Sequence, residues 1–211
     1  MWLILGLLWS GASAEVPPPD YRTALLERIE HETDRLLENG EPEQALAHVH
    51  RFRTQVTDDP RLAYEEALVL RHLERPKRAA KLLNEAIEGD PELAAAWYDL
   101  GEIRLIQGKL DEAQAAFVQA TVLTEFHPHG WAGPYRLAEI AAFRGEADDF
   151  ERQLEEALRR GFSFQRTVSG DARWAEFMKN PELASILRRL TTVYGEESVL
   201  ESWRSPAPTA P

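Results

Sequence analysis

Residues 94–125 read AAAWYDLGEIRLIQGKLDEAQAAFVQATVLTE, and this stretch decides the fold. It predicts two helices that are separated by Gly108, because a residue without a Cβ can adopt the left-handed conformation of a tight turn. Asp111 follows the turn and is expected to cap the second helix. The stretch therefore predicts a helix–turn–helix unit.

The same stretch supplies the residues that pack the two helices together. Gly101 and Ala113 are small, and we expect them where the helices cross, since only small side chains allow a close approach there. Trp97 and Phe117 are large and apolar, and they are expected to fill the space beside the crossing.

A period of 34 residues extends the pattern toward the N-terminus. Two series of apolar residues show this period: Ala45, Ala79 and Ala113, and Val49, Leu83 and Phe117. With Trp97, Leu100 and Gly101 in its first helix, the stretch 94–125 resembles the tetratricopeptide repeat family, whose unit has 34 residues. The resemblance implies an all-α fold, an α-solenoid of stacked helix–turn–helix units that binds proteins or peptides. It implies no single biochemical activity.

Four units and a closing segment follow from this resemblance. The units are expected at residues 21–59, 60–93, 94–127 and 131–161. Residues 162–204 lose the period and resemble the helical segment that often closes bacterial arrays of this family, because a solenoid must cover its last apolar face. Residues 205–211 are expected to be a disordered, Pro-rich tail.

The register of the last unit has two readings. Trp131 follows Trp97 by 34 residues, which favours an unbroken period. In that register, however, Tyr135 would occupy the small-residue crossing position, which is sterically unfavourable. Three inserted residues within 127–130 place Ala138 there instead, and we prefer this reading.

The N-terminal segment has the pattern of a secretory signal. Residues 2–9 form an apolar run that is too short to span a bilayer, and Ala12 and Ala14 make a small-x-small cleavage pattern. We expect a signal peptide over residues 1–14, a Pro-rich linker over 15–20, and a periplasmic or secreted protein without stable membrane insertion. No Lys or Arg precedes the run, so an uncleaved N-terminal membrane anchor is the alternative.

Composition excludes several classes of function. The 211 residues carry a net charge of -12, which argues against nucleic-acid binding. There is no Cys, so disulfides, thiol nucleophiles and Cys-bound zinc are excluded. The acidic excess is largest in residues 15–59, which carry 11 acidic and 5 basic side chains. A basic partner would be steered toward that end.

The sequence contains no recognisable catalytic motif, and we expect neither an enzyme nor a bound cofactor. His31 has Arg35 where a zinc-protease motif needs its second histidine, and a cation there repels a metal ion. His127 and His129 share a loop but lack an evident third ligand, so we expect no metal site and interpret them as loop residues.

In a tetratricopeptide stack the first helices line a concave groove, and the resemblance assigns groove positions in each unit. Tyr64, Tyr98 and Tyr135 would occupy one equivalent position in three successive units. A tyrosine row offers apolar rings and hydrogen-bonding tips to a peptide, although the same residues can serve packing alone. The residues expected to contact a partner are Tyr64, Tyr98, Tyr135, Arg61, Arg71, Leu68, Glu102, Leu105 and Arg136.

Two functions remain open at this stage. The first is a non-catalytic scaffold that binds a peptide segment or a partner protein in its groove. The second is a structural subunit of a homo- or hetero-oligomeric envelope assembly that has no peptide ligand. The sequence predicts neither the partner nor the oligomeric state.

Overall fold

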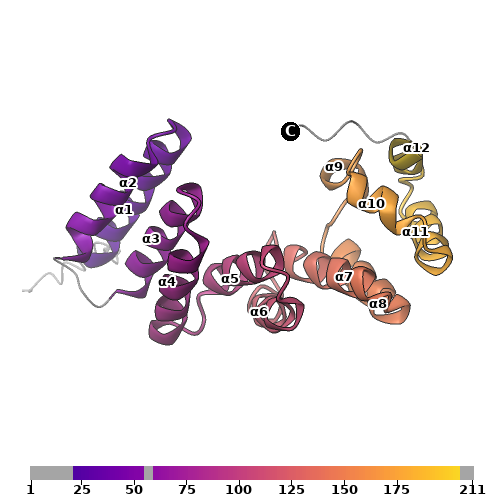
Figure 1. The fold of residues 1–211 in the computed structure, drawn as a ribbon, viewed down its shortest axis with the longest axis horizontal. Coiled ribbons are helices and arrows are strands. Elements are labelled where there is room, and N and C mark those ends of the chain that lie inside the picture. Colours follow the sequence, from indigo (N-terminus) through magenta and orange to yellow (C-terminus); the bar gives the residue numbers. More distant parts are fainter. Residues whose placement is uncertain (1–20, 55–58, 205–211) are drawn as a thin grey trace, which may run out of the picture.

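A computed structural model describes residues 21–54 and 59–204, so the expected signal peptide, linker and tail lie outside the described residues. Within these two ranges the chain forms twelve helices and no strand. The prediction of an all-α solenoid is confirmed. The chain curves, so that α1 and α2 at one end and the last four helices at the other rise on either side of α5–α8 (Figure 1).

The first eight helices form four antiparallel pairs, and each pair packs on the next. The pairs are α1 (Tyr21–Glu38) with α2 (Pro42–Arg53), α3 (Pro60–His72) with α4 (Pro76–Gly89), α5 (Ala94–Ile106) with α6 (Leu110–Leu123), and α7 (Ala132–Arg144) with α8 (Ala147–Arg159). The closing helices are α9 (Phe164–Thr167), α10 (Ala172–Phe177), α11 (Pro181–Val193) and α12 (Val199–Arg204).

A residue with positive φ ends the first helix of every pair. These residues are Gly40 (φ 73°), Glu74 (φ 55°), Gly108 (φ 71°) and Gly145 (φ 73°). Their spacings are 34, 34 and 37 residues, so the last pair has the length of a standard unit plus three residues. The second helices agree, since α4, α6 and α8 begin at residues 76, 110 and 147.

The helix crossing depends on small residues, as expected. A Cβ placed on Gly101 would lie 2.6 Å from Phe117 Cε1. The equivalent residues of the neighbouring pairs are Ala67, 34 positions earlier, and Ala138, 37 positions later, and neither has any exposed surface. The inserted register therefore puts alanine at the crossing in the last unit.

One expected cap is wrong. Asp111 does not cap α6, which begins one residue before it, with Lys109 at the N-cap position and no side-chain cap hydrogen bond. Asp111 instead lies in the first turn of α6, where its negative charge favours the helix dipole. The helices that do receive a side-chain cap include α3 from Asp59 and α11 from Asn180.

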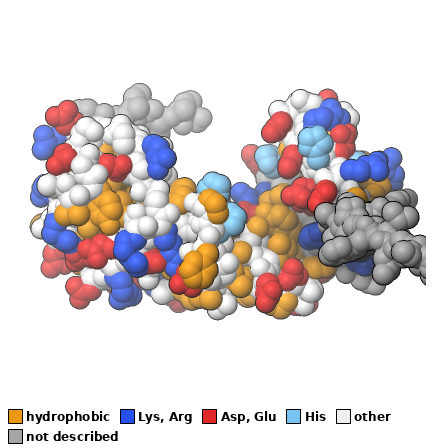
Figure 2. Space-filling model, turned by 180° about the vertical axis from the view of Figure 1, so that it is seen from behind, with side chains coloured by type: hydrophobic (Ala, Val, Ile, Leu, Met, Phe, Trp, Pro, Cys, Tyr) orange, Lys and Arg blue, Asp and Glu red, His pale blue; other side chains and the backbone are white. Residues whose placement is uncertain are grey.

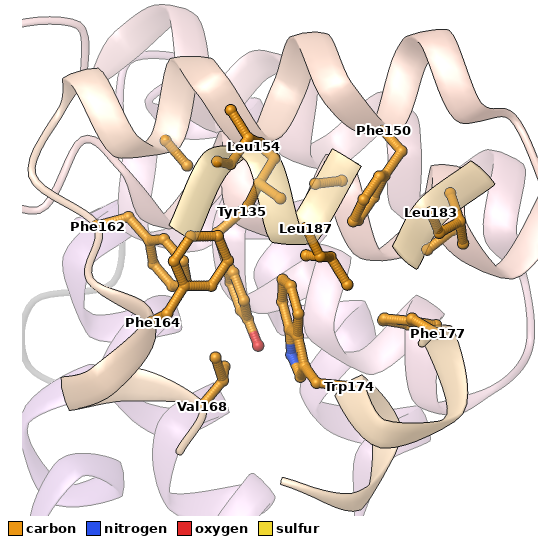
Figure 3. Packing of buried hydrophobic residues seen from close by; sticks show 14 of the residues in the cluster. Tyr135, Phe150, Leu154, Phe162, Phe164, Val168, Trp174, Phe177, Leu183 and Leu187 are labelled. Carbon is orange, nitrogen blue, oxygen red and sulfur yellow. The ribbon is translucent and has the colours of Figure 1, made fainter. Parts of the chain in front are cut away.

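The closing helices cover the last pair with an aromatic core (Figure 3). Trp174 of α10 has no exposed surface and lies at the centre of this core. Its ring stacks on Trp203 at 5.5 Å between centroids and contacts Phe177 edge-on at 5.7 Å. Apolar residues on and before α11 complete this cover: Leu183, Leu187 and Leu190 are buried, and Met178 and Ile186 pack against the same cluster.

Candidate partner-binding groove

The space-filling surface is hollowed between the two ends of the array, and hydrophobic and histidine side chains lie beside the hollow (Figure 2). The expected groove residues come from α3, α5 and α7, the first helices of three successive pairs. The structure places most of their charged side chains in contacts with one another. These contacts determine which charged groups of the groove remain available to a partner.

The first of these contacts joins α3 to α5. The Tyr64 hydroxyl donates a hydrogen bond to Asp99 Oδ2 at 3.0 Å, and Arg71 forms an ion pair with the same carboxylate. Asp99 is only 7% exposed. Burial raises the pKa of Asp99, and the nearby Arg71 partly offsets this rise. Tyr64 and Arg71 are therefore anchored to the next unit.

The second contact joins α5 to α7 through Arg136. Arg136 donates a hydrogen bond from Nη2 to Glu102 Oε2 at 2.8 Å and another from Nη1 to Glu139 Oε2 at 2.5 Å. Burial opposes the charged form of Arg136, but Glu139, Tyr98 and Glu102 together raise its pKa. The guanidinium group is thus held between two carboxylates, one on each helix.

Tyr135 departs from the expected row of groove tyrosines. It is 5% exposed and stacks on Phe162 and Trp174, with centroid distances of 5.0 and 6.0 Å. Its hydroxyl donates to Glu139 at 2.9 Å. The closing region brings these aromatic residues over α7, so the row of partly exposed tyrosines stops at Tyr98. The packing interpretation applies to Tyr135.

The remaining residues that were expected to contact a partner differ in how exposed their side chains are. Arg61 is exposed and pairs with Asp59 at 3.3 Å. Leu68 is partly buried, and Leu105 packs on the cluster that includes Phe117. Tyr98 also contacts Phe117 edge-on, at 5.4 Å between ring centroids. Leu105 and Tyr98 therefore pack in the core, and their role in partner binding stays a prediction.

A pocket of about 490 Å³ opens beside Tyr64 and Tyr98. Its lining includes the exposed Ala95 on α5 and, from the loop between α6 and α7, His127, His129 and Trp131. Sequence reasoning assigned no binding role to the loop residues. The signal was present in the insertion itself, because extra residues between two packed helices lengthen the loop beside the groove.

The family of the chain follows from a comparison of its sequence with known families. The sequence model of the tetratricopeptide repeat matches residues 33–94 and 64–122. The chain is a tetratricopeptide repeat protein. The first match runs from the end of α1 through α4, the second runs from within α3 through most of α6, and the two overlap on α3 and α4. The sequence resemblance is thus confirmed.

Solved structures show the same fold. Pseudomonas aeruginosa pilF is 14% identical, with a TM-score of 0.67 over 87% of this chain and 90% of that chain. MamA from Desulfovibrio magneticus RS-1 is 16% identical, with a TM-score of 0.63 over 82% of this chain and 95% of that chain. A comparison with curated proteins found no significant match. At these identities the likeness establishes the fold alone. The coarse role of a protein–protein interaction scaffold follows from membership of the tetratricopeptide repeat family.

In residues 21–54 and 59–204 no group of three His, Asp or Glu side chains is placed to hold a metal ion. His127 Nδ1 accepts a hydrogen bond from the backbone N–H of His129 at 3.2 Å, which supports the interpretation of the pair as loop residues. None of the helices in the same ranges combines the length and the apolar character needed to cross a bilayer.

Proposed function

We propose that this tetratricopeptide repeat protein is a non-catalytic, periplasmic or secreted scaffold that binds a segment of a partner protein in its groove. The observation that carries the proposal is the pocket beside Tyr64 and Tyr98. Its lining combines aromatic rings and alanine side chains with two exposed histidines, which suits an apolar side chain flanked by polar backbone. The apolar run and the Ala12–Ala14 pattern support export, with an N-terminal anchor as the alternative.

The pairing of charges supports binding rather than catalysis. The carboxylates of Asp99, Glu102 and Glu139 each contact an arginine of α3, α7 or α10. Side chains that are paired in this way are held in place, which makes the binding surface rigid. A general acid or base, by contrast, must be available to exchange a proton with the substrate. A rigid groove loses less entropy on binding an extended segment.

Replacing two alanines by glutamine, one inside the pocket and one outside it, tests the role of the pocket. Ala95 on α5 lines the pocket and Ala115 on α6 does not, and both are exposed. We expect Ala95→Gln to reduce capture of the partner from an extracytoplasmic fraction of the source cells by about tenfold, because a polar side chain fills the pocket. Ala115→Gln makes the same change in size and leaves the net charge unchanged, and it should capture as much as the wild type. Equal capture by both variants would remove the pocket from the binding site.

A second candidate function is a subunit of an oligomer. The observation that favours it is the exposure of large apolar side chains on and after α6, where Val122 is 66% exposed and Phe126 is 94% exposed. Large apolar side chains that gather on one surface mark protein–protein interfaces. Sedimentation equilibrium distinguishes the two functions: a concentration-dependent dimer that Phe126→Ser dissociates supports the oligomer, and a monomer at all concentrations supports the groove scaffold.

A further inference from the structure

Glu65 on α3 and Asp99 on α5 occupy the same place in successive units, since they are 34 residues apart and lie equally far from the positive-φ turns. On α3, the first helix of the preceding pair, Tyr64 donates a hydrogen bond to Asp99 and Arg71 neutralises its charge. The two helices are joined by these contacts. The equivalent junction between α1 and α3 has a different composition.

At that first junction α1 offers no such partners to Glu65. The residue 34 positions before Tyr64 is Glu30, and the residue 34 positions before Arg71 is Leu37. Glu65 is 6% exposed, and its Oε2 has no hydrogen-bond partner among the described residues. A buried polar atom without a partner costs about 1–3 kcal/mol, and more when it is charged.

The electrostatic surroundings of Glu65 are acidic. Burial raises the pKa of Glu65 to about 8, and the charges of Glu30 and Asp34 contribute to the rise. Glu30 and Asp34 are themselves exposed, so the cluster reaches the solvent through α1. By the 34-residue period, Glu30 corresponds to Tyr64 and Asp34 to Leu68, both expected groove positions. The buried carboxylate therefore lies at the acidic end of the groove.

The arginines of α1 and α3 other than Arg28 already have ion-pair partners. On α3, Arg61 pairs with Asp59 and Arg71 pairs with Asp99. On α1, Arg35 pairs with Glu32, and Arg28 lines a separate pocket between α1 and α2. Residues 1–20, 55–58 and 205–211 contain no Lys or Arg in the sequence.

We propose that Glu30, Asp34 and Glu65 form a socket for the Arg or Lys side chain of a partner segment that lies in the groove. The proposal rests on the proposed function, and it adds the chemical class of the partner: a segment with one basic side chain near the end that meets α1. The acidic excess of residues 15–59 steers such a segment to this end of the array. A guanidinium or ammonium group supplies there what Arg71 supplies to Asp99 in the next unit.

The experiment uses a phage-displayed library of random dodecapeptides as the probe. Peptides are selected on the full chain, and one is synthesised both as selected and with its basic residue replaced by a neutral one, citrulline for Arg. Two variants are compared with the wild type: Glu65→Gln, and the control Glu27→Gln, which loses the same charge from an exposed site on α1 that lines the other pocket. Glu65→Gln keeps the size of the side chain and removes the unpaired acid, so we expect it to fold.

We expect the selected peptides to share a Lys or Arg at one position. The neutral peptide and Glu65→Gln should each weaken binding by at least tenfold, whereas Glu27→Gln should change it less than twofold. Because Glu65 must lose its proton to pair with the cation, wild-type affinity should rise between pH 6 and pH 9, and binding at pH 7 should release protons. Affinity that is independent of pH over this range would overturn the part assigned to Glu65.

The other outcomes separate the socket from the groove. Peptides without a shared cation, whose binding is lost in Ala95→Gln but kept in Glu65→Gln, would overturn the socket and leave the proposed function intact. Failure to select any peptide would count against both. A dimer of the chain that Glu65→Gln dissociates would assign the basic side chain to a second copy and overturn the partner segment.

Discussion

The ring of Phe117 lies directly against the backbone of Gly101, so that a methyl group on Gly101 would approach Phe117 Cε1 to 2.6 Å. This contact sets the distance between α5 and α6. We expect Gly101→Ala to lower the free energy of unfolding by about 1–3 kcal/mol, because overpacking exceeds the gain in helix propensity. Urea denaturation measures the change.

A second substitution shows whether the ring causes the loss. Phe117→Leu shortens the side chain opposite Gly101, so the double variant should lose less stability than the sum of the two single variants. Strict additivity would mean that the ring and the glycine do not interact, and it would contradict the packing described for this crossing.

Glu74 is the one described turn residue at positive φ that is not glycine. Its equivalents Gly40, Gly108 and Gly145 have similar φ values. A side chain in the left-handed region costs about 1 kcal/mol, so we expect Glu74→Gly to raise the free energy of unfolding by about that amount. Gly108→Ala is the reverse change at the equivalent turn and should lower it. A thermal melt of each variant is sufficient, and a lower melting temperature for Glu74→Gly would contradict the prediction.

The helices and the 34-residue period were predictable because each unit repeats the same local requirements. Small residues at the crossing and a turn residue with positive φ recur along the chain. The sequence shows the crossing through Gly101 and its alanine equivalents, and it shows three of the four turns through Gly40, Gly108 and Gly145, but not the turn at Glu74. The register of the last unit was also predictable, since Tyr135 is too large for the crossing. Local sterics decide these features, so sequence patterns reveal them.

The groove was less predictable because its residues are shared between units. Tyr135 has the same place in its unit as Tyr64 and Tyr98, yet Phe162 and Trp174 of the closing region bury it. Arg71 and Arg136 were expected to face a partner, but acids of neighbouring helices hold both. A repeat pattern gives the position of a residue within its unit and does not give its neighbours in the next unit.

Glu139 connects the array to its closing helices. It has no exposed surface, and it contacts Arg136 on its own helix and Arg173 of α10, the latter at 3.1 Å. Removing one member of a buried ion pair costs about 3–5 kcal/mol, and we expect Glu139→Gln to lose stability within that range or somewhat below it, since Gln still accepts hydrogen bonds. Hydrogen exchange should accelerate most in α10–α12.

A matched variant controls for the loss of charge. Glu176→Gln removes a carboxylate from α10 itself, but Glu176 is exposed and its ion-pair partner is Lys179, in the turn that follows α10. Exchange in α10–α12 should therefore stay close to that of the wild type. Equal effects of the two substitutions would show that Glu139 has no special part in holding the closing helices.

Glu65 should make the stability of the chain depend on pH in a direction unusual for a carboxylate. Its pKa is raised from 4.5 to about 8 in the folded chain, so the folded state binds more protons than the unfolded state between these values. The stabilising effect of its proton is complete below the unfolded pKa and is lost as the pH rises through the folded pKa, by up to about 1.4 kcal/mol per pH unit. We expect the difference in free energy of unfolding between Glu65→Gln and the wild type to grow in favour of the variant from pH 5 to pH 8. This difference should be constant above pH 9.

Glu27→Gln is the control, since it alters an exposed carboxylate of α1, and it should show no such trend. A parallel pH profile for the wild type and Glu65→Gln would mean that Glu65 is already paired in solution.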